Sequence, residues 1–312
     1  MHTGRVCHRD YIYNGGQELV PVSNSDIAAV DARQPGAGPS DNPGGGYTVP
    51  SDVGTWQQYR ARVEGGFMRF FRAPDSRRWV VQSPDGSRFD FGVITTGASD
   101  LDSTQALEVD NEDRTRVFRW MISRSSDAHG GAIYYRYTQD QGQIYVADIS
   151  YVSPISCAGG ASVASRRDCT APTSSYGARV RFVYESRQDA FSTYSSGYPI
   201  TTAKRLKRVE VTAYDDASSG RTLVRRYHLT YETAPFHSLL STIRVEGRPQ
   251  TSSTLNVLGT TLTIAQGNAS VSESSLGDTI VGQLLPRCAF ATRHFRRRAP
   301  RLLASARFRA PR

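Results

Sequence analysis

The chain has 312 residues, of which 38% are hydrophobic and 10% aromatic, enough for one large β domain or two ordinary ones. Its formal net charge is +9, but residues 287–312 hold nine Arg and no Asp or Glu, so the remainder is formally neutral. This distribution argues against a basic nucleic-acid-binding fold. No window approaches the ~18 apolar residues of a membrane span, and the first 20 residues lack the apolar run of a signal peptide.

The N-terminal segment, residues 1–30, is predicted to contain a β-hairpin. Two short strands between Tyr11 and Val20 flank Asn14-Gly15, a strong signal for a two-residue turn. Residues 31–55 follow as a Gly/Pro-rich loop, because this composition cannot bury enough apolar surface to order itself.

Residues 56–286 are predicted to be a region of stacked β-hairpins. Trp79–Val81 and Phe89–Phe91 flank an Asp85-Gly86 turn, which indicates a further hairpin. No stretch keeps apolar residues at helical spacing for ten residues, so the chain is predicted to be all-β and helix-poor.

Three later hairpins form an internal repeat, each with an apolar-x-apolar-x-Tyr strand and a second strand of apolar-x-x-apolar-x-apolar spacing. The units are Ile133, Tyr135, Tyr137 with Val146, Ile149, Tyr151; Val180, Phe182, Tyr184 with Leu206, Val209, Val211; and Tyr227, Leu229, Tyr231 with Leu240, Ile243, Val245. Their closing tyrosines lie 47 residues apart both times, and the middle unit carries an insertion near residues 186–203. Hairpins with one apolar face must stack on their neighbours, which predicts a twisted or spiral antiparallel sheet.

The four cysteines do not define a zinc site, because no Cys-x-x-Cys pair occurs. Cys157 and Cys169 flank a Gly/Ser-rich stretch. They could close a loop as a disulfide or remain two thiols in that loop, and the sequence leaves both alternatives open.

Several stretches resemble the SpvB-type region of insecticidal toxin-complex B subunits, and the hairpins resemble degenerate YD repeats of the RHS superfamily. The residues that carry this resemblance are Tyr59-Arg60, Glu64, Phe67, Arg69-Phe70, Trp79-Val80-Val81, Asp85-Gly86, Phe91-Gly92, Trp120, Asp127, Gly130-Gly131, Tyr135-x-Tyr137, Ile149-Ser150-Tyr151, Phe182-Val183-Tyr184-Glu185-x-Arg187-x-Asp189, Lys204 to Val209, Arg226-Tyr227-x-Leu229-x-Tyr231 and Ser238-Leu239-Leu240. The resemblance implies a structural segment of a hollow shell wall that encloses a cytotoxic passenger. It also implies partners, namely other toxin-complex subunits or the remaining RHS shell.

This sequence departs from the family pattern at both ends. The N-terminal region that the family has ahead of the Tyr11 hairpin is not expected here, and the integrin-like propeller repeats and the long RHS array expected after the hairpins do not follow. After Pro286 the composition is that of an out-of-frame translation of GC-rich DNA. We therefore expect a truncated or frameshifted product, with residues 287–312 as a basic, disordered tail.

No catalytic, cofactor-binding or metal-binding residues are predicted, and the chain is expected not to be an enzyme. The sequence contains no Glu-x-Glu, Gly-x-Ser-x-Gly or His-Glu-x-x-His motif. His228 is expected to face solvent on the strand face opposite the apolar residues. Asp100 and Asp102 are expected in a solvated turn. Glu64 and Glu185 are expected to form cross-strand ion pairs.

The sequence therefore favours a secreted, extracellular shell segment without catalysis. A first alternative is a secreted or surface β-domain that binds glycans through an aromatic platform flanked by Asp, Asn or Gln. A second is non-specific binding of polyanions or nucleic acid through the Arg296-Arg297-Arg298 cluster of the tail, with no specific nucleic-acid recognition.

Overall fold

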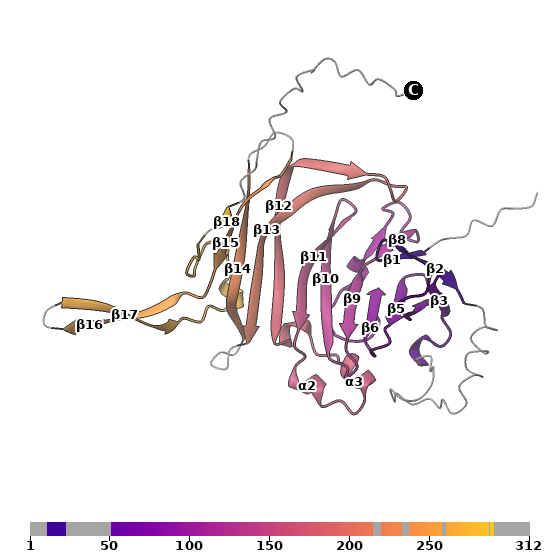
Figure 1. Ribbon diagram of the computed structural model, residues 1–312, viewed down its shortest axis with the longest axis horizontal. Helices are drawn as coiled ribbons and strands as arrows, with labels where there is room; N and C mark the ends of the chain where they lie inside the picture. The colour runs from indigo at the N-terminus through magenta and orange to yellow at the C-terminus, as the bar shows by residue number, and fades with distance from the viewer. Residues whose placement is uncertain are drawn as a thin grey trace, which may run out of the picture.

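The structure, a computed structural model, describes residues 11–22, 51–214, 220–232, 237–257, 260–286 and 288–289. One antiparallel sheet dominates these ranges (Figure 1). Its 14 strands, in spatial order, are β1 (Tyr11–Tyr13), β2 (Gln17–Pro21), β3 (Gln57–Ala61), β4 (Arg69–Arg72), β5 (Arg78–Gln82), β6 (Arg88–Gly92), β9 (Ile122–Ser126), β10 (Ala132–Asp140), β11 (Gln143–Tyr151), β12 (Ala178–Thr193), β13 (Ile200–Tyr214), β14 (Arg221–Tyr231), β15 (Leu240–Glu246) and β18 (Cys288–Ala289). The predicted all-β fold of antiparallel hairpins is confirmed.

Strands that follow one another in the chain are neighbours in the sheet except at two places, where a separate hairpin leaves it. These hairpins are β7 (Leu107–Val109) with β8 (Val117–Trp120), and β16 (Gln250–Val257) with β17 (Thr260–Asn268). The short helices are α2 (Ile155–Ala158), α3 (Val163–Arg167) and the 3-10 turns η1 (Ser51–Val53), η2 (Ser103–Ala106), η3 (Thr173–Ser175) and η4 (Glu273–Ser275). All of them lie in connections between strands, which agrees with the helix-poor prediction.

Both predicted turn signals form hairpins. Asn14 and Gly15 have φ of 49° and 75°, the left-handed conformation, in the connection between β1 and β2. Tyr13 pairs with Gln17, so this connection has three residues, Asn14 to Gly16, rather than the predicted two. Gly86, with φ of 85°, turns β5 into β6, and Trp79 pairs with Phe91. The predicted loop at residues 31–55 falls outside the described residues up to position 50. Of the predicted tail, only Cys288 and Ala289 are described.

The three repeat units form the hairpins β10–β11, β12–β13 and β14–β15. Their closing tyrosines occupy equivalent positions, because Tyr137 pairs with Val146, Tyr184 with Leu206 and Tyr231 with Leu240. In each pair the register shifts by one residue immediately before the tyrosine, which marks a β-bulge. The repeat read from the sequence is therefore a repeat of pairing geometry as well.

A fourth unit precedes these three and carries Phe91 in place of the tyrosine. Phe91 pairs with Ile122 of β9, and the same register shift occurs between Asp90 and Phe91. Sequence reasoning missed this unit because the closing residue lacks a hydroxyl and because the β7–β8 hairpin separates its two strands.

The middle unit differs from the others in the length of its strands. Residues 186–203, the predicted insertion, continue β12 and β13 and form the turn between them. The lengthened hairpin bends over the end of the sheet toward β8 (Figure 1). Tyr198 at its tip is buried, and Glu108 and Asp110 of the β7–β8 hairpin, together with burial, raise the pKa of its phenol to about 12.

The strand register assigns side chains to two faces of opposite character, because neighbouring residues of a strand point to opposite sides. One face, called the apolar face below, carries the repeat tyrosines and the alternating aliphatic residues. It is well buried at the N-terminal end, where Leu19, Tyr59, Phe70 and Trp79 form a cluster and the Tyr59 and Trp79 ring centroids lie 5.1 Å apart. The other face, called the charged face, carries Arg, Asp and Glu.

Candidate functional site

The charged face holds a row of residues whose signs alternate across six neighbouring strands. The register places them directly opposite one another in the order Arg136, Asp148, Arg181, Glu210, Arg226, Glu246, from β10 to β15. Opposite charges at directly paired positions stabilise a sheet, whereas like charges there would repel. This row, called the charge ladder, therefore favours one pairing register over its neighbours.

The C-terminal end of the ladder is the most deeply buried part. Arg226 donates to both carboxylate oxygens of Glu246 at 2.8 Å, and neither side chain is exposed. Both side chains also bond to the segment that follows η4. Val281 and Gly282 donate their backbone N–H groups to Glu246, and Arg226 donates to the carbonyls of Gly277 and Thr279. The ion pair thus holds residues 277–282, which cross the charged face, against the sheet.

His228 belongs to this same cluster, and its predicted exposure to solvent is wrong. Its Nε2 lies 2.6 Å from Glu246 Oε2, and only 15% of its side chain is exposed. His228 lies on the strand face that the sequence indicated, opposite the apolar residues, but residues 276–283 cover that face. Burial acts to raise the pKa of Glu246, but hydrogen bonds from Arg226, His228 and two backbone amides outweigh this effect and lower the pKa to about 2.

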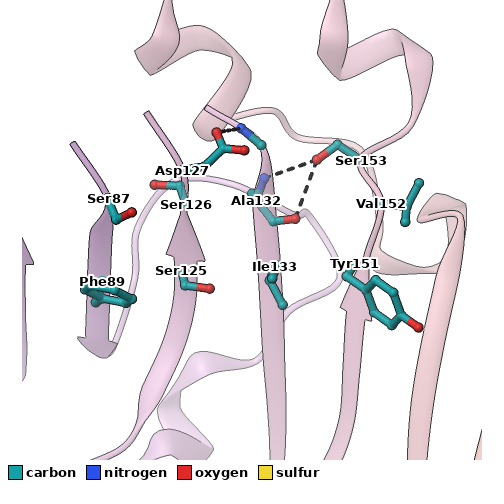
Figure 2. A pocket seen from close by; sticks show the side chains of 11 residues that line it. Ser87, Phe89, Ser125, Ser126, Asp127, Ala132, Ile133, Tyr151, Val152 and Ser153 are labelled. Carbon is teal, nitrogen blue, oxygen red and sulfur yellow. Dashed lines mark hydrogen bonds between the residues drawn. The ribbon is translucent and has the colours of Figure 1, made fainter. Parts of the chain in front are cut away.

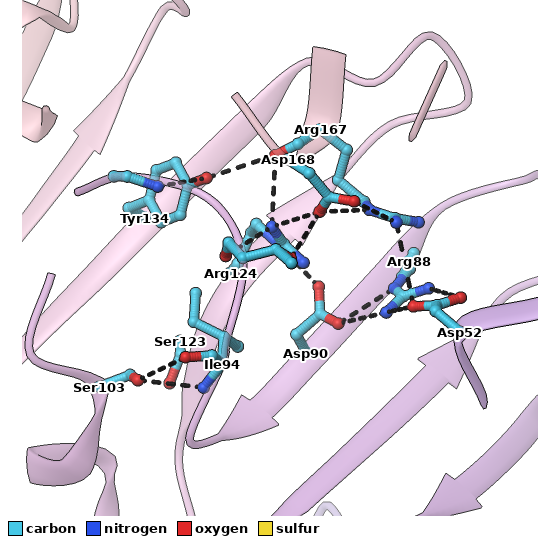
Figure 3. A network of polar contacts seen from close by, with 12 residues as sticks. Asp52, Arg88, Asp90, Ile94, Ser103, Ser123, Arg124, Tyr134, Arg167 and Asp168 are labelled. Atoms are coloured by element: carbon cyan, nitrogen blue, oxygen red, sulfur yellow. Dashed lines mark hydrogen bonds and ion pairs between the residues drawn. The ribbon is translucent and has the colours of Figure 1, made fainter. Parts of the chain in front are cut away.

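A second buried network lies beneath the N-terminal half of the charged face (Figure 3). Arg88 and Arg124 both donate to Asp90, at 2.8 and 2.9 Å, and Arg124 also donates to Asp168 Oδ1 at 2.9 Å. Arg88 reaches outward to Asp52 at 2.7 Å. The two guanidiniums keep the pKa of Asp90 below its usual value against the opposing effect of burial. A cavity of about 90 Å³ adjoins the network.

These buried charges are paired by one another and by backbone groups, which indicates a structural role. Every named carboxylate accepts from at least one guanidinium, so none of them is an unpaired base. The networks join strands β6, β9 and β14 to the connections at residues 93–103, 153–177 and 270–286. Sequence reasoning missed them, although the alternation of acidic and basic residues at paired strand positions was present as a signal.

The other acidic residues considered from the sequence have mixed outcomes. Glu185 pairs with Arg205 of the neighbouring strand at 2.7 Å, as predicted. Glu64 instead lies in the turn between β3 and β4 and accepts the backbone N–H of Phe67, so the predicted cross-strand pair is wrong. Asp102 caps η2 by accepting from Thr104.

Asp100 is not only the solvated turn residue that was predicted, because its carboxylate accepts hydrogen bonds from two other parts of the chain. Its carboxylate accepts from the backbone N–H of Thr173 at 2.6 Å, from the Thr173 hydroxyl at 2.8 Å and from Arg136 at 3.2 Å. These hydrogen bonds and the Arg136 charge keep its pKa low despite partial burial. Asp100 therefore joins two connections that are 73 residues apart in the sequence.

The apolar face remains open over β12–β15, whereas at β10 and β11 Ala106 of η2 packs on Tyr137 and Ile144. The repeat residues Tyr135, Val180, Phe182, Leu229 and Val245 are all only half-buried. Tyr137, at 5% exposure, is the most buried of the closing tyrosines. A contiguous apolar surface of this kind is typical of an interaction face rather than of a free surface.

A shallow hollow of about 480 Å³ lies on the apolar face at the ends of β6, β9, β10 and β11 (Figure 2). Phe89, Ile133 and Tyr151 form its apolar part. Ser153 at its rim accepts the backbone N–H of Ala132 at 3.2 Å. The hollow has no nucleophile–base pair among its lining residues, so its geometry fits contact rather than chemistry.

Cys157 and Cys169 form a disulfide, with Cα atoms 5.5 Å apart, which decides between the two alternatives left open by the sequence. Among the described residues, no group of three His, Cys, Asp or Glu side chains could hold a metal ion. No helix in the described part of the chain is long and apolar enough to cross a membrane.

Comparison with known proteins agrees with this geometry. Residues 8–153, just under half of the chain, match the family model SpvB, described as Salmonella virulence plasmid 65kDa B protein. The chain therefore contains an SpvB-type region, as the resemblance implied. No curated protein matches the sequence.

Solved structures with the same fold come from two kinds of protein. The crystal structure of TcdB2-TccC3-Cdc42 aligns with 81% of this chain at 19% identity and a TM-score of 0.56. The N-terminal domain of effector protein SpvB from Salmonella typhimurium strain LT2 aligns with 76% at 18% identity and a TM-score of 0.56. The Photorhabdus luminescens Tc holotoxin pore aligns with 80% at 20% identity and a TM-score of 0.51.

The share of the relative's own length that this chain spans differs between the two kinds of protein. This chain spans 81% of the SpvB N-terminal domain but only 13% of the TcdB2-TccC3-Cdc42 chain and 12% of the holotoxin chain. At identities below 25% these likenesses show the fold, namely the twisted antiparallel sheet that these proteins share.

Proposed function

We propose that this chain is a structural segment of a secreted toxin shell, which acts outside the producing cell and encapsulates or delivers a cytotoxic passenger without catalysis of its own. The open apolar face of β12–β15 carries the proposal. An isolated domain would be expected to cover its apolar face and expose its charged one, whereas here residues 277–282 cover Arg226 and Glu246 on the charged face, and the apolar face of the same strands is open.

The edges of the sheet support the same function. Within the described residues, β1 and β18 each have one neighbour, so both ends of the sheet present unpaired backbone groups. A shell wall built from successive hairpins pairs such edges with the next hairpin and turns one face toward an enclosed volume. The solved relatives named as TcdB2-TccC3 complexes support partners of the toxin-complex kind.

Size-exclusion chromatography and binding of the dye ANS test the proposal. We expect the chain alone to oligomerise and bind ANS, and co-expression with an RHS shell segment of a toxin complex to suppress both. Replacing Phe182 and Leu229 of the open face by Ser should reduce ANS binding. Replacing Val63, which is 83% exposed outside that face, should leave it unchanged.

A sharp monomer peak without ANS binding, combined with a cooperative melt above ~45 °C, would contradict the proposal. That result would describe an ordinary independent domain whose apolar face needs no partner.

A further inference from the structure

The connection between β11 and β12 is a flap, residues 153–177, that crosses the charged face of the sheet. It contains α2, α3, η3 and the disulfide between Cys157 and Cys169, and it lies below the sheet in Figure 1. Two parts of the flap are held in different ways. We call residues 154–166 its outer part and residues 167–176 its inner part.

The inner part is held by buried side chains of the sheet. Arg124, with 2% of its side chain exposed, donates to the Arg167 carbonyl at 3.3 Å and to Asp168 at 2.9 Å. The Tyr134 hydroxyl donates to the same carbonyl at 3.3 Å. Arg221 donates to three further carbonyls, of Thr173, Ser174 and Tyr176. These contacts do not involve the disulfide.

The outer part has far fewer ties to the sheet. Arg166 donates to the His129 carbonyl at 2.6 Å, and α3 lies so close to Gly130 that an added Cβ would come within 2.5 Å of the Val163 carbonyl. Ile155, in contrast, is 91% exposed. Besides the backbone itself, the disulfide ties the outer part to the inner part by joining Cys157 to Cys169, the residue after Asp168.

We propose that the Cys157–Cys169 disulfide is a redox-controlled latch: when oxidised it holds the outer part of the flap against the Gly130 turn, and when reduced it releases that part. A thiol reductant opens the latch. Two thiol groups of the reductant give up two hydrogens to Cys157 and Cys169. The bond between the two cysteine sulfurs breaks, both cysteines become thiols, and the reductant leaves as its own disulfide. The inner part stays in place, because its contacts come from Arg124, Tyr134 and Arg221.

The flap begins beside the hollow of Figure 2, because Ser153 is one of the residues that line it. Cys157 is buried, but Cys169 is only half-buried, so a thiol can attack the bond at Cys169. Oxidising surroundings outside a cell keep such a bond, whereas the thiols of a cytosol reduce it. The latch would thus distinguish the two compartments.

Limited trypsin digestion, read by mass spectrometry, tests the latch in the full chain. Arg166 lies in the outer part, inside the disulfide loop, and exposed Arg114 in the β7–β8 turn supplies an internal reference. We expect reduction by a water-soluble phosphine, which becomes its oxide as water supplies the oxygen and two hydrogens, to raise cleavage at Arg166 at least about tenfold relative to Arg114, whereas Arg167, in the inner part, stays protected. Cleavage follows the population of the open form, and reduction returns freedom to the loop.

Two double variants separate the latch from other effects of reduction. Cys157→Ser with Cys169→Ser should show the high cleavage ratio with or without phosphine. Cys7→Ser with Cys288→Ser should behave as the unaltered chain does. An unchanged ratio on reduction would overturn the proposal. So would loss of the cooperative melt on reduction, because the disulfide would then be a staple of the whole fold.

Discussion

Arg226 and Glu246 form a bidentate ion pair across β14 and β15, with both nitrogen–oxygen distances at 2.8 Å and neither side chain exposed to solvent. Removing one member of such a pair leaves a buried charge without compensation. The pair also ends the charge ladder and holds the segment at residues 277–282, so its loss affects both the sheet and its cover.

We predict that Glu246→Gln lowers the free energy of unfolding by about 3–5 kcal/mol, the cost of breaking a buried pair from one side. Urea denaturation measures this change. The matched variant Glu18→Gln breaks an exposed pair with Arg62 and should cost less than about 1 kcal/mol. Similar costs for both variants would show that the buried pair has no special weight.

Stability should fall in acid because of Glu246 and Asp168. Hydrogen bonds and guanidinium neighbours, acting against burial, lower the pKa of each carboxyl to about 2 in the folded protein, below its value in the unfolded chain. A lowered folded-state pKa stabilises the fold above the unfolded-state pKa, and this stabilisation is lost as the pH falls toward 2. Denaturation midpoints between pH 6 and ~2.5 should decline, and Glu246→Gln should flatten the decline. A flat profile in the unaltered chain would contradict this assignment.

The closing tyrosines should contribute through their hydroxyls as well as their rings. Tyr137 donates to the Ile122 carbonyl at 2.7 Å, Tyr184 to Val146 at 2.9 Å and Tyr231 to Leu206 at 2.6 Å. Each acceptor is the residue paired with the closing aromatic residue of the preceding unit. The hydroxyl of one unit is thus bonded at the bulge of the unit before it.

We predict that Tyr137→Phe destabilises the fold by about 1 kcal/mol, because the Ile122 carbonyl loses its hydroxyl donor. Tyr135→Phe is the control, since its hydroxyl has only a long contact of 3.4 Å with Ser125, and it should cost less than about 0.5 kcal/mol. Thermal melts of the two variants measure the difference. A larger destabilisation by Tyr135→Phe than by Tyr137→Phe would refute the contribution of the bulge hydrogen bonds to stability.

Two glycines with the same backbone conformation should differ in how much their replacement by alanine destabilises the fold. Gly15 and Gly92 have φ of 75° and 74°, but an added Cβ meets nothing within 4 Å at Gly15 and lies 2.2 Å from the Arg77 carbonyl at Gly92. Gly15→Ala should therefore cost about 1 kcal/mol from conformation alone. Gly92→Ala should cost at least ~2 kcal/mol more, because the backbone at Arg77, just before β5, must move. Equal midpoints in urea would show that this contact relaxes without cost.

The sequence by itself determined the hairpins and their order. Asn14-Gly15 and Asp85-Gly86 define their turns through local backbone preference, and the alternation around Tyr137, Tyr184 and Tyr231 assigns each apolar residue to a face. Both signals are local, since a turn and the two strands beside it lie within a few tens of residues. The repeat, the all-β class and the Glu185–Arg205 pair follow from the same short-range patterns.

Only the tertiary structure decided which face of the sheet is covered. His228 and Glu246 lie on the face that the pattern assigned to solvent, but residues 276–283 cross it, and a strand pattern contains no information about a cover from a later segment. The fourth unit was hidden for a related reason, because Phe91 and Ile122 are joined across an inserted hairpin. Alternation reports that two faces differ in polarity, whereas burial depends on which distant segments pack on each of them.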